Sequence, residues 1–216
     1  MPDLTIKAQL AGWSALQGEC PDRSGNVYIV DAEARYITAI SRAGEEHGIL
    51  TDDDGTPLSC AVNPINGDVA VTNNVTSGNG NIVIFPGGSG SGAPISVPRM
   101  HTYFFDGYDR SGNLWVDGYA ANSKSIVASC SGSHCREIPV SNGTIFHPGF
   151  VQYAAAQKTW YVADRECGGA TRFCIYPVSA SGVLGNEITL TDAHGAPVCD
   201  MFQGTITDAG SRVFVG

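Results

Sequence analysis

Apolar and polar residues alternate over short stretches of this chain, and each stretch adjoins a turn. Residues 22–29 read DRSGNVYI, and the pattern returns at 63–71 and 109–116. Residues 156–162 form a degenerate copy and 208–215 a fifth, so the spacing is about 42–53 residues. Alternation with a period of two is typical of strands, and a fixed period of this length is typical of repeat folds.

Each repeat unit predicts four short strands, with a glycine turn between the first two. Four antiparallel strands per unit of this size predict an all-β chain that forms one β-propeller domain, with about five units visible. The alternative is a β-sandwich, which many short strands also suit but which does not explain the repeat. The units are expected near residues 14–56, 57–101, 102–144, 145–197 and an incomplete 198–216, with 1–13 as the last strand of a preceding or closing blade.

Composition agrees with strands and tight turns rather than long helices. Hydrophobic residues make up 43% of the chain and charged residues 15%, with 27 glycines and 11 prolines. This mixture is typical of a globular chain with many turns and enough apolar surface for a core.

Charge and hydropathy exclude some classes of partner. The net charge is −9, from 12 basic and 21 acidic residues, whereas nucleic-acid binding depends on Lys and Arg that neutralise phosphates. No apolar run approaches the ~20 residues that span a bilayer. Residues 1–7 (MPDLTIK) show no basic region followed by an apolar one, so no secretion signal is visible.

Seven cysteines are many for a chain kept in a reducing compartment. Cys130 and Cys135 enclose a predicted hairpin turn, and Cys167 and Cys174 enclose another. Both pairs are expected to close small disulfide loops. Such disulfides favour an extracytoplasmic protein, either secreted or periplasmic.

Other interpretations of the cysteines stay open. Cys130, His134 and Cys135 offer three zinc ligands, although no second pair follows at finger-like spacing. The hairpin cysteines also suit inert buried thiols. The other three cysteines fall just before the repeated segment and are interpreted as small core residues: Cys20, Cys60 and Cys199.

Two copies of the repeat resemble the NHL-repeat signature, because residues 25–31 read GNVYIVD and residues 112–117 read GNLWVD. Residues 81–95 are similar to the third and fourth strands of NHL-like and lactonase-like propellers. Nearly the whole chain therefore resembles the NHL-repeat and gluconolactonase-like β-propeller superfamily. The resemblance implies the fold but no single activity, because such propellers include lactonases, lyases, cyclases and binding proteins.

The repeat pattern starts and stops inside a blade. Residues 4–10 resemble the last strand of a blade, and the final unit stops after its second strand. Two arrangements are expected: a fragment of a six- or seven-bladed ring, or an irregular five-bladed ring.

In propellers that resemble this one, the loops before the first strand and after the second strand meet at one rim around the central channel. The second set repeats in four units and is a candidate ligand-binding set: Asp31, Asn73, Asp117 and Asp164. Repetition at one position also favours a structural role, because Asp or Asn at a strand end accepts hydrogen bonds from nearby loop amides.

The first set does not repeat and holds the candidates for chemistry. Glu19, Asp106 and Asp200 are candidate ligands for Ca²⁺ or another divalent cation, because carboxylates from several blades converge on one axis. The resemblance implies that such a metal would polarise a lactone carbonyl, with His101 or His147 as an acid or base. A histidine satisfied by loop backbone is the structural alternative.

Three functions follow from these patterns. The first is an extracytoplasmic propeller that binds a small molecule, glycan or protein on its rim. The second is a metal-dependent lactonase or lyase with its site at the mouth of the channel. The third is a structural repeat module of a longer protein.

Overall fold

The computed structural model describes residues 12–75, 79–167, 172–192, 194–198, 204–206 and 213–215. Its elements are strands, apart from the short 3-10 turn η1 (Pro86–Gly88). The described strands form four sheets of four strands and one of two. No helix in these ranges has the length and apolar character that crossing a bilayer requires.

Each sheet is one blade, and its strands follow one another in chain order. The strands are, in blade one, β1 (Leu16–Pro21), β2 (Val27–Asp31), β3 (Tyr36–Ile40) and β4 (Glu46–Thr51); in blade two, β5 (Thr56–Val62), β6 (Val69–Asn74), β7 (Asn81–Phe85) and β8 (Ala93–Ile95); in blade three, β9 (Met100–Tyr108), β10 (Leu114–Ala120), β11 (Ser125–Ser131) and β12 (His134–Ile138); in blade four, β13 (Pro148–Ala154), β14 (Thr159–Asp164), β15 (Cys174–Val178) and β16 (Ile188–Thr189); and then β17 (Gly204–Ile206) and β18 (Val213–Val215).

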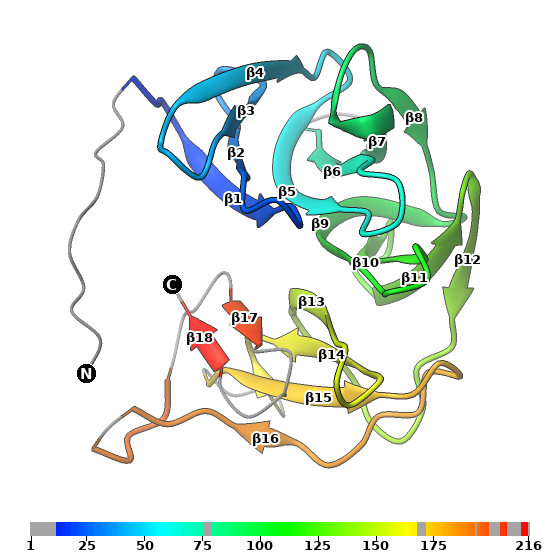
Figure 1. Ribbon diagram of the computed structural model, residues 1–216. Coiled ribbons are helices and arrows are strands. Elements are labelled where there is room, and N and C mark those ends of the chain that lie inside the picture. The colour runs from blue at the N-terminus through cyan, green and yellow to red at the C-terminus, as the bar shows by residue number, and fades with distance from the viewer. Residues whose placement is uncertain are drawn as a thin grey trace.

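The blades are arranged around a common axis, with the first strand of each blade nearest the centre (Figure 1). β1 contacts β5, β5 contacts β9, β9 contacts β13 and β13 contacts β17. This is the architecture of a β-propeller, so the predicted fold class is confirmed and the sandwich alternative is wrong.

The alternation of apolar residues fills the space on both sides of a blade. In β10, Leu114 and Val116 pack against blade two, whereas Trp115 lies between them in sequence and packs against blade four. Trp115 stacks on Trp160 with ring centroids 4.5 Å apart and an interplanar angle of 15°. Tyr28 is buried in the same way between blades one and two. The aromatic residues of the second strands therefore fill the spaces between blades, as the sequence predicts.

The repeated Asp-x-x-Gly-Asn segment is a tight turn between the first two strands. Asp22 Oδ1 accepts the backbone N–H of Ser24 at 2.8 Å and of Asn26 at 2.9 Å, and Oδ2 accepts the Asn26 side chain at 2.7 Å. Gly25 has a φ of 84°, a left-handed conformation that favours glycine. Asp109 makes the same three bonds in its own turn. The motif is conserved between blades because the turn needs it.

Both expected hairpin disulfides are present. Cys130–Cys135 joins β11 to β12. Cys167–Cys174 joins the loop that follows β14 to the first residue of β15. Cys130 and Cys135 therefore offer no thiolate to a metal, and the zinc interpretation with His134 is wrong for this structure.

A third disulfide, Cys20–Cys60, was not expected from the sequence, which favoured small core residues at both positions. It joins β1 to β5, with the Cα atoms 5.6 Å apart. Both residues precede the repeated turn in neighbouring units, so they lie at similar heights on adjacent first strands. This bond links two blades next to the axis, whereas Cys199 lies outside the described residues.

We expect the disulfide between blades to stabilise the fold more than a hairpin disulfide. Cys20–Cys60 spans 40 residues and Cys130–Cys135 spans five. In the loop-entropy relation, these spans correspond to about 4 and about 2 kcal/mol. Urea unfolding of the double Cys→Ser variants should therefore show the larger loss for Cys20 and Cys60. Equal losses would contradict the expectation.

Candidate ligand site in the central cavity

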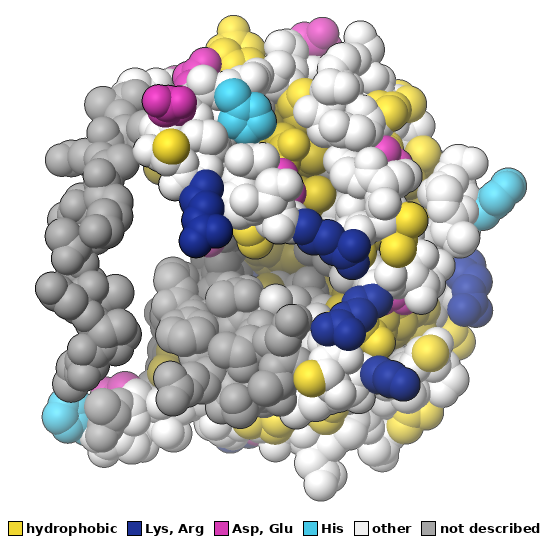
Figure 2. All heavy atoms as spheres, in the orientation of Figure 1, with side chains coloured by type: hydrophobic (Ala, Val, Ile, Leu, Met, Phe, Trp, Pro, Cys, Tyr) yellow, Lys and Arg dark blue, Asp and Glu magenta, His cyan; other side chains and the backbone are white. Residues whose placement is uncertain are grey.

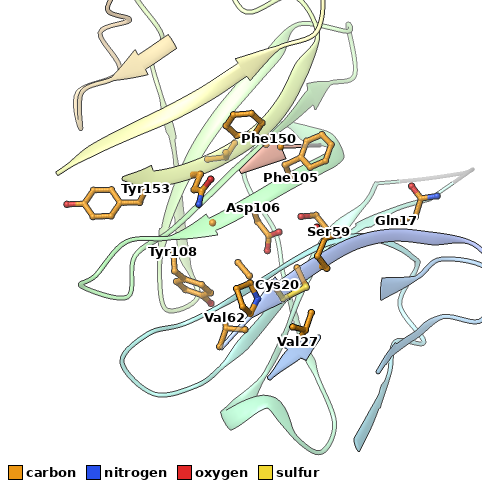
Figure 3. A pocket seen from close by; sticks show the side chains of 18 of the residues that line it. Gln17, Cys20, Val27, Ser59, Val62, Phe105, Asp106, Tyr108, Phe150 and Tyr153 are labelled. Atoms are coloured by element: carbon orange, nitrogen blue, oxygen red, sulfur yellow. A yellow bond between two sulfur atoms is a disulfide. The ribbon is translucent and has the colours of Figure 1, made fainter. Parts of the chain in front are cut away.

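The first strands of the blades enclose a cavity of about 950 Å³ on the propeller axis (Figure 3). Its lining comes from β1, β5, β9 and β13, with Val27 of β2 and Gly204 of β17. Figure 2 shows the face at which this region is hollowed, with hydrophobic side chains inside the hollow and Lys and Arg side chains around it. The described lining residues include Glu19 and Asp106 but no Lys, Arg or His, so the lining is acidic.

Asp106 occupies the wall of this cavity and is only 7% exposed. Neither of its carboxylate oxygens makes a hydrogen bond of good geometry, and the Ser59 hydroxyl is the nearby side-chain donor. In Figure 3 the carboxylate lies between Ser59 and the aromatic residues of the lining. Burial raises the pKa of Asp106 to about 7, although the nearby Ser59 hydroxyl acts to lower it. A buried carboxylate without hydrogen bonds of good geometry is costly, which makes Asp106 the strongest candidate in the described chain for contact with a ligand.

The alternation of side chains along β9 explains why the Asp106 side chain faces blade two at the wall of the cavity. Phe105 packs between blades three and four, and the next residue therefore turns toward blade two. Asp106 lies opposite Val116, which also faces blade two. The following residue, Gly107, lets β13 approach closely, because a Cβ there would lie 2.6 Å from the carbonyl oxygen of Val151. The packing of the blades therefore shields the carboxylate of Asp106 from most of the solvent.

Two of the three predicted metal ligands share the cavity. Glu19 of β1 is exposed and lines the same space as Asp106, while Asp200 lies outside the described residues. A buried carboxylate with a second carboxylate in the same cavity fits a hard cation. Among the described residues, however, the one group of three metal-binding side chains is Cys167, Cys174 and Glu187, and its cysteines form a disulfide. In the central cavity, the described residues therefore offer a metal two carboxylates, those of Glu19 and Asp106.

The predicted histidines lie elsewhere. His101 lines a second cavity of about 910 Å³ beside blade three, together with Arg99 and Lys124. His147 lies with Nδ1 3.5 Å from Glu166 Oε1, and its ring meets that of Tyr119 edge to face at 6.2 Å. Neither histidine lines the central cavity, so the structure does not bring them to Asp106.

Asp31 and Asp164 hold the segments that lead into their own blades. Asp31 accepts the backbone N–H groups of Ser14 at 2.7 Å and Ala15 at 3.1 Å. Burial acts to raise the pKa of Asp31, but four backbone amides outweigh it and lower the pKa. Asp164 accepts the N–H groups of Phe146 and His147 at 2.8 and 2.9 Å. The same function in two blades accounts for the repetition of this residue.

Asn73 and Asp117 occupy the same place in blades two and three, with different partners. Asn73 Nδ2 donates to Asp52 Oδ2 at 2.8 Å and to Asn81 Oδ1 at 3.1 Å. Asp117 Oδ1 accepts the N–H of Phe105 at 3.0 Å, and burial raises its pKa well above the usual range. These bonds support the structural role that the sequence also favoured, and ligand binding by this set stays a prediction.

The sequence did not single out several residues of the cavity. Besides Ser59, the amides of Gln17 and Gln152 and the rings of Tyr108 and Tyr153 belong to the lining. They stand on first strands, which are the least regular part of the repeat, with bulges in β1, β5, β9 and β13. A weak signal existed, since the first strands differ most between the units, as expected for a site that does not repeat.

The fold and the cavity define a β-propeller with a candidate site on its axis. Comparison with protein families and with curated proteins finds no match. Solved propellers are similar to it at low identity: a streptogramin B lyase structure (15% identity, TM-score 0.65, covering 99% of this chain and 70% of that one), a nidogen/laminin complex (16%, 0.68, 93% and 71%), and a calcium-binding protein, regucalcin, from Agrobacterium tumefaciens (13%, 0.61, 95% and 68%). At these identities the likeness establishes the fold alone.

Replacement of the buried acid gives a pH-dependent gain in stability. The pKa of Asp106 is raised to about 7 in the folded state, against about 3.9 when unfolded. The folded state therefore holds a proton that the unfolded state has lost, and stability falls as pH rises from about 4 to 7. Asp106→Asn should exceed the wild type at pH 8 by up to about 4 kcal/mol and differ little below pH 4.

Urea unfolding in EDTA at several pH values measures this gain. Asp53→Asn, which changes an exposed acid on the loop after β4, is the control and should show no comparable trend. A difference between Asp106→Asn and the wild type that does not vary with pH would contradict the raised pKa.

Proposed function

We propose that this propeller is a ligand-binding module of an extracytoplasmic compartment, with a small molecule held in its central cavity. The observation that carries the proposal is the acidic cavity itself, whose wall holds a buried carboxylate that makes no hydrogen bond of good geometry. Its volume of about 950 Å³ lies within the range of small-molecule sites, which are ~300–1,000 Å³. A ligand that donates to Asp106 would offset the cost of burying that group.

The lining also has the mixed character of a ligand site. The half-buried rings of Tyr108 and Tyr153 supply apolar surface, while Gln17 and Gln152 supply amides. Such a combination provides contact area together with a small number of polar groups that orient a ligand. The rim remains a second place for a glycan or protein partner, and the nidogen propeller of the nidogen/laminin complex shows a similar fold in a protein complex.

The three disulfides support an oxidising compartment. All three pairs join residues of the described chain, and one of them links two blades. Structural disulfides persist in secreted and periplasmic proteins and are rare in a reducing cytosol. The proposed extracytoplasmic location therefore rests on the three disulfides.

Substitutions that fill the cavity with a large side chain test the proposed site. Ser59→Trp places a large ring beside Asp106, whereas Ser133→Trp adds the same ring to the exposed turn between β11 and β12. Saturation-transfer NMR with a library of small fragments should show binding to the wild type and to Ser133→Trp, with most signals lost in Ser59→Trp. Gln152→Phe provides a second block if Ser59→Trp does not fold.

Fragments that bind the blocked variants as well as the wild type would refute a ligand site in the cavity. Absence of fragment binding to the wild type would have the same consequence, and the structural repeat module would then be the better hypothesis.

A second candidate is a metal-dependent lactonase or lyase with its site at the mouth of the channel. Glu19 and Asp106, which line one cavity, would hold Ca²⁺ or another divalent cation, and Asp200 would be a third ligand. Such an ion supplies Lewis-acid polarisation of a carbonyl. The protein's own groups there are Ser59 and the two glutamines, which would orient a substrate. The similar folds of a lyase and of a calcium-binding protein accompany this candidate.

Native mass spectrometry with and without chelator tests the metal. A stoichiometric Ca²⁺, Mg²⁺ or Zn²⁺ that is lost in Glu19→Gln or Asp106→Asn, and retained in the control Asp53→Asn, would favour the enzyme and justify an assay with lactones. A wild-type protein that binds no divalent cation at millimolar concentration would exclude a metal-dependent activity at this site.

A further inference from the structure

We propose that the central cavity selects an organic cation, a protonated or quaternary amine attached to an apolar body. The inference rests on the proposed function, because it names the ligand class of the same cavity. Its two parts are the charge of the lining and the chemistry of the walls.

The charge of the described lining has one sign. Glu19 and Asp106 are its charged residues, and the cations seen around the hollow in Figure 2 do not belong to the lining. A buried carboxylate repels an anionic ligand and leaves a neutral apolar ligand without a partner for its oxygens. An ammonium group supplies both the opposite charge and the missing hydrogen-bond donors, and such charge-assisted bonds are the stronger ones.

Asp106 is placed to make that contact. It is more than nine-tenths buried, neither oxygen makes a hydrogen bond of good geometry, and the carboxylate lies beside Ser59 at the wall of the cavity in Figure 3. Four other acidic residues of the described chain accept backbone amides instead. Asp22 and Asp109 accept amides of their own turns, and Asp31 and Asp164 accept the amides that precede their blades.

The walls favour an organic cation over a bare metal ion. The half-buried rings of Tyr108 and Tyr153 lie on one side of Asp106 in Figure 3, whereas the rings of Phe105 and Phe150, on the other side, are buried in the packing of the blades. Aromatic faces attract ammonium groups and also pack against an apolar body. Beside the two carboxylates, the described lining offers Ca²⁺, which needs six to eight oxygen ligands, no further charged group. The cavity volume of about 950 Å³ leaves room for such a body.

Matched pairs of probes test the charge directly. Isothermal titration calorimetry of the full chain, after removal of divalent cations with EDTA, uses 2-phenylethylamine, its N,N,N-trimethyl derivative and benzyltrimethylammonium, each compared with neutral 2-phenylethanol. At least one cation should bind the wild type ten or more times more tightly than the alcohol. Tenfold corresponds to about 1.4 kcal/mol, which is within reach of one hydrogen bond to a charged group.

Variants connect the selectivity to the carboxylate. Asp106→Asn keeps the shape and removes the charge, so the preference for the cation should fall at least tenfold while binding of the alcohol stays unchanged. Glu19→Gln is a second variant, on β1, and should reduce the preference less, because that residue is exposed. Asp53→Asn, away from the cavity, should behave as the wild type.

Two results would overturn the inference and leave the proposed function intact. One is equal binding of the alcohol and the amines, or a preference that survives in Asp106→Asn. The other is no binding of any cation in the panel by a protein that binds neutral fragments in the NMR screen. A protein that binds neither cations nor fragments would refute both proposals together.

Discussion

The packing of each blade against its neighbours is the constraint on which the rest of this structure depends. A four-stranded sheet with apolar residues on both faces cannot bury them alone. Leu114 and Val116 cover one face of β10, and Trp115 covers the other. Trp115 stacks on Trp160 between blades three and four, and burial of such rings is a major source of stability in a fold of short strands.

Once the blades pack face to face, their first strands must meet at the axis. That convergence creates the central cavity and decides which side chains enter it. Close packing of β9 and β13 depends on Gly107, and it leaves the neighbouring Asp106 in a site of low polarity. A carboxylate in such a place lowers stability at neutral pH. Its presence at a cavity is typical of groups that a protein keeps for binding or catalysis.

The acidic residues of this chain have two distinct functions, which burial alone does not separate. Asp31 is buried, yet backbone amides surround its oxygens and lower its pKa. Asp106 is also buried, but no backbone amide bonds to its oxygens from the strands around it, and burial raises its pKa. The first kind repeats from blade to blade because every blade has the same turns and strand ends. Burial also raises the pKa of Asp117, but of these two residues only Asp106 lines the central cavity, where the units differ.

The sequence by itself determined the propeller, the alternation of its faces and the two hairpin disulfides, because these depend on local turns and on a period of two. It also named Glu19 and Asp106 among its candidates for the axis. The tertiary structure decided that these two share a cavity while His101 and His147 do not. It also decided that Cys20 pairs with Cys60. The physical reason is that contacts between blades join residues some 40 positions or more apart, and their geometry follows from how sheets pack rather than from the spacing of residues along one strand.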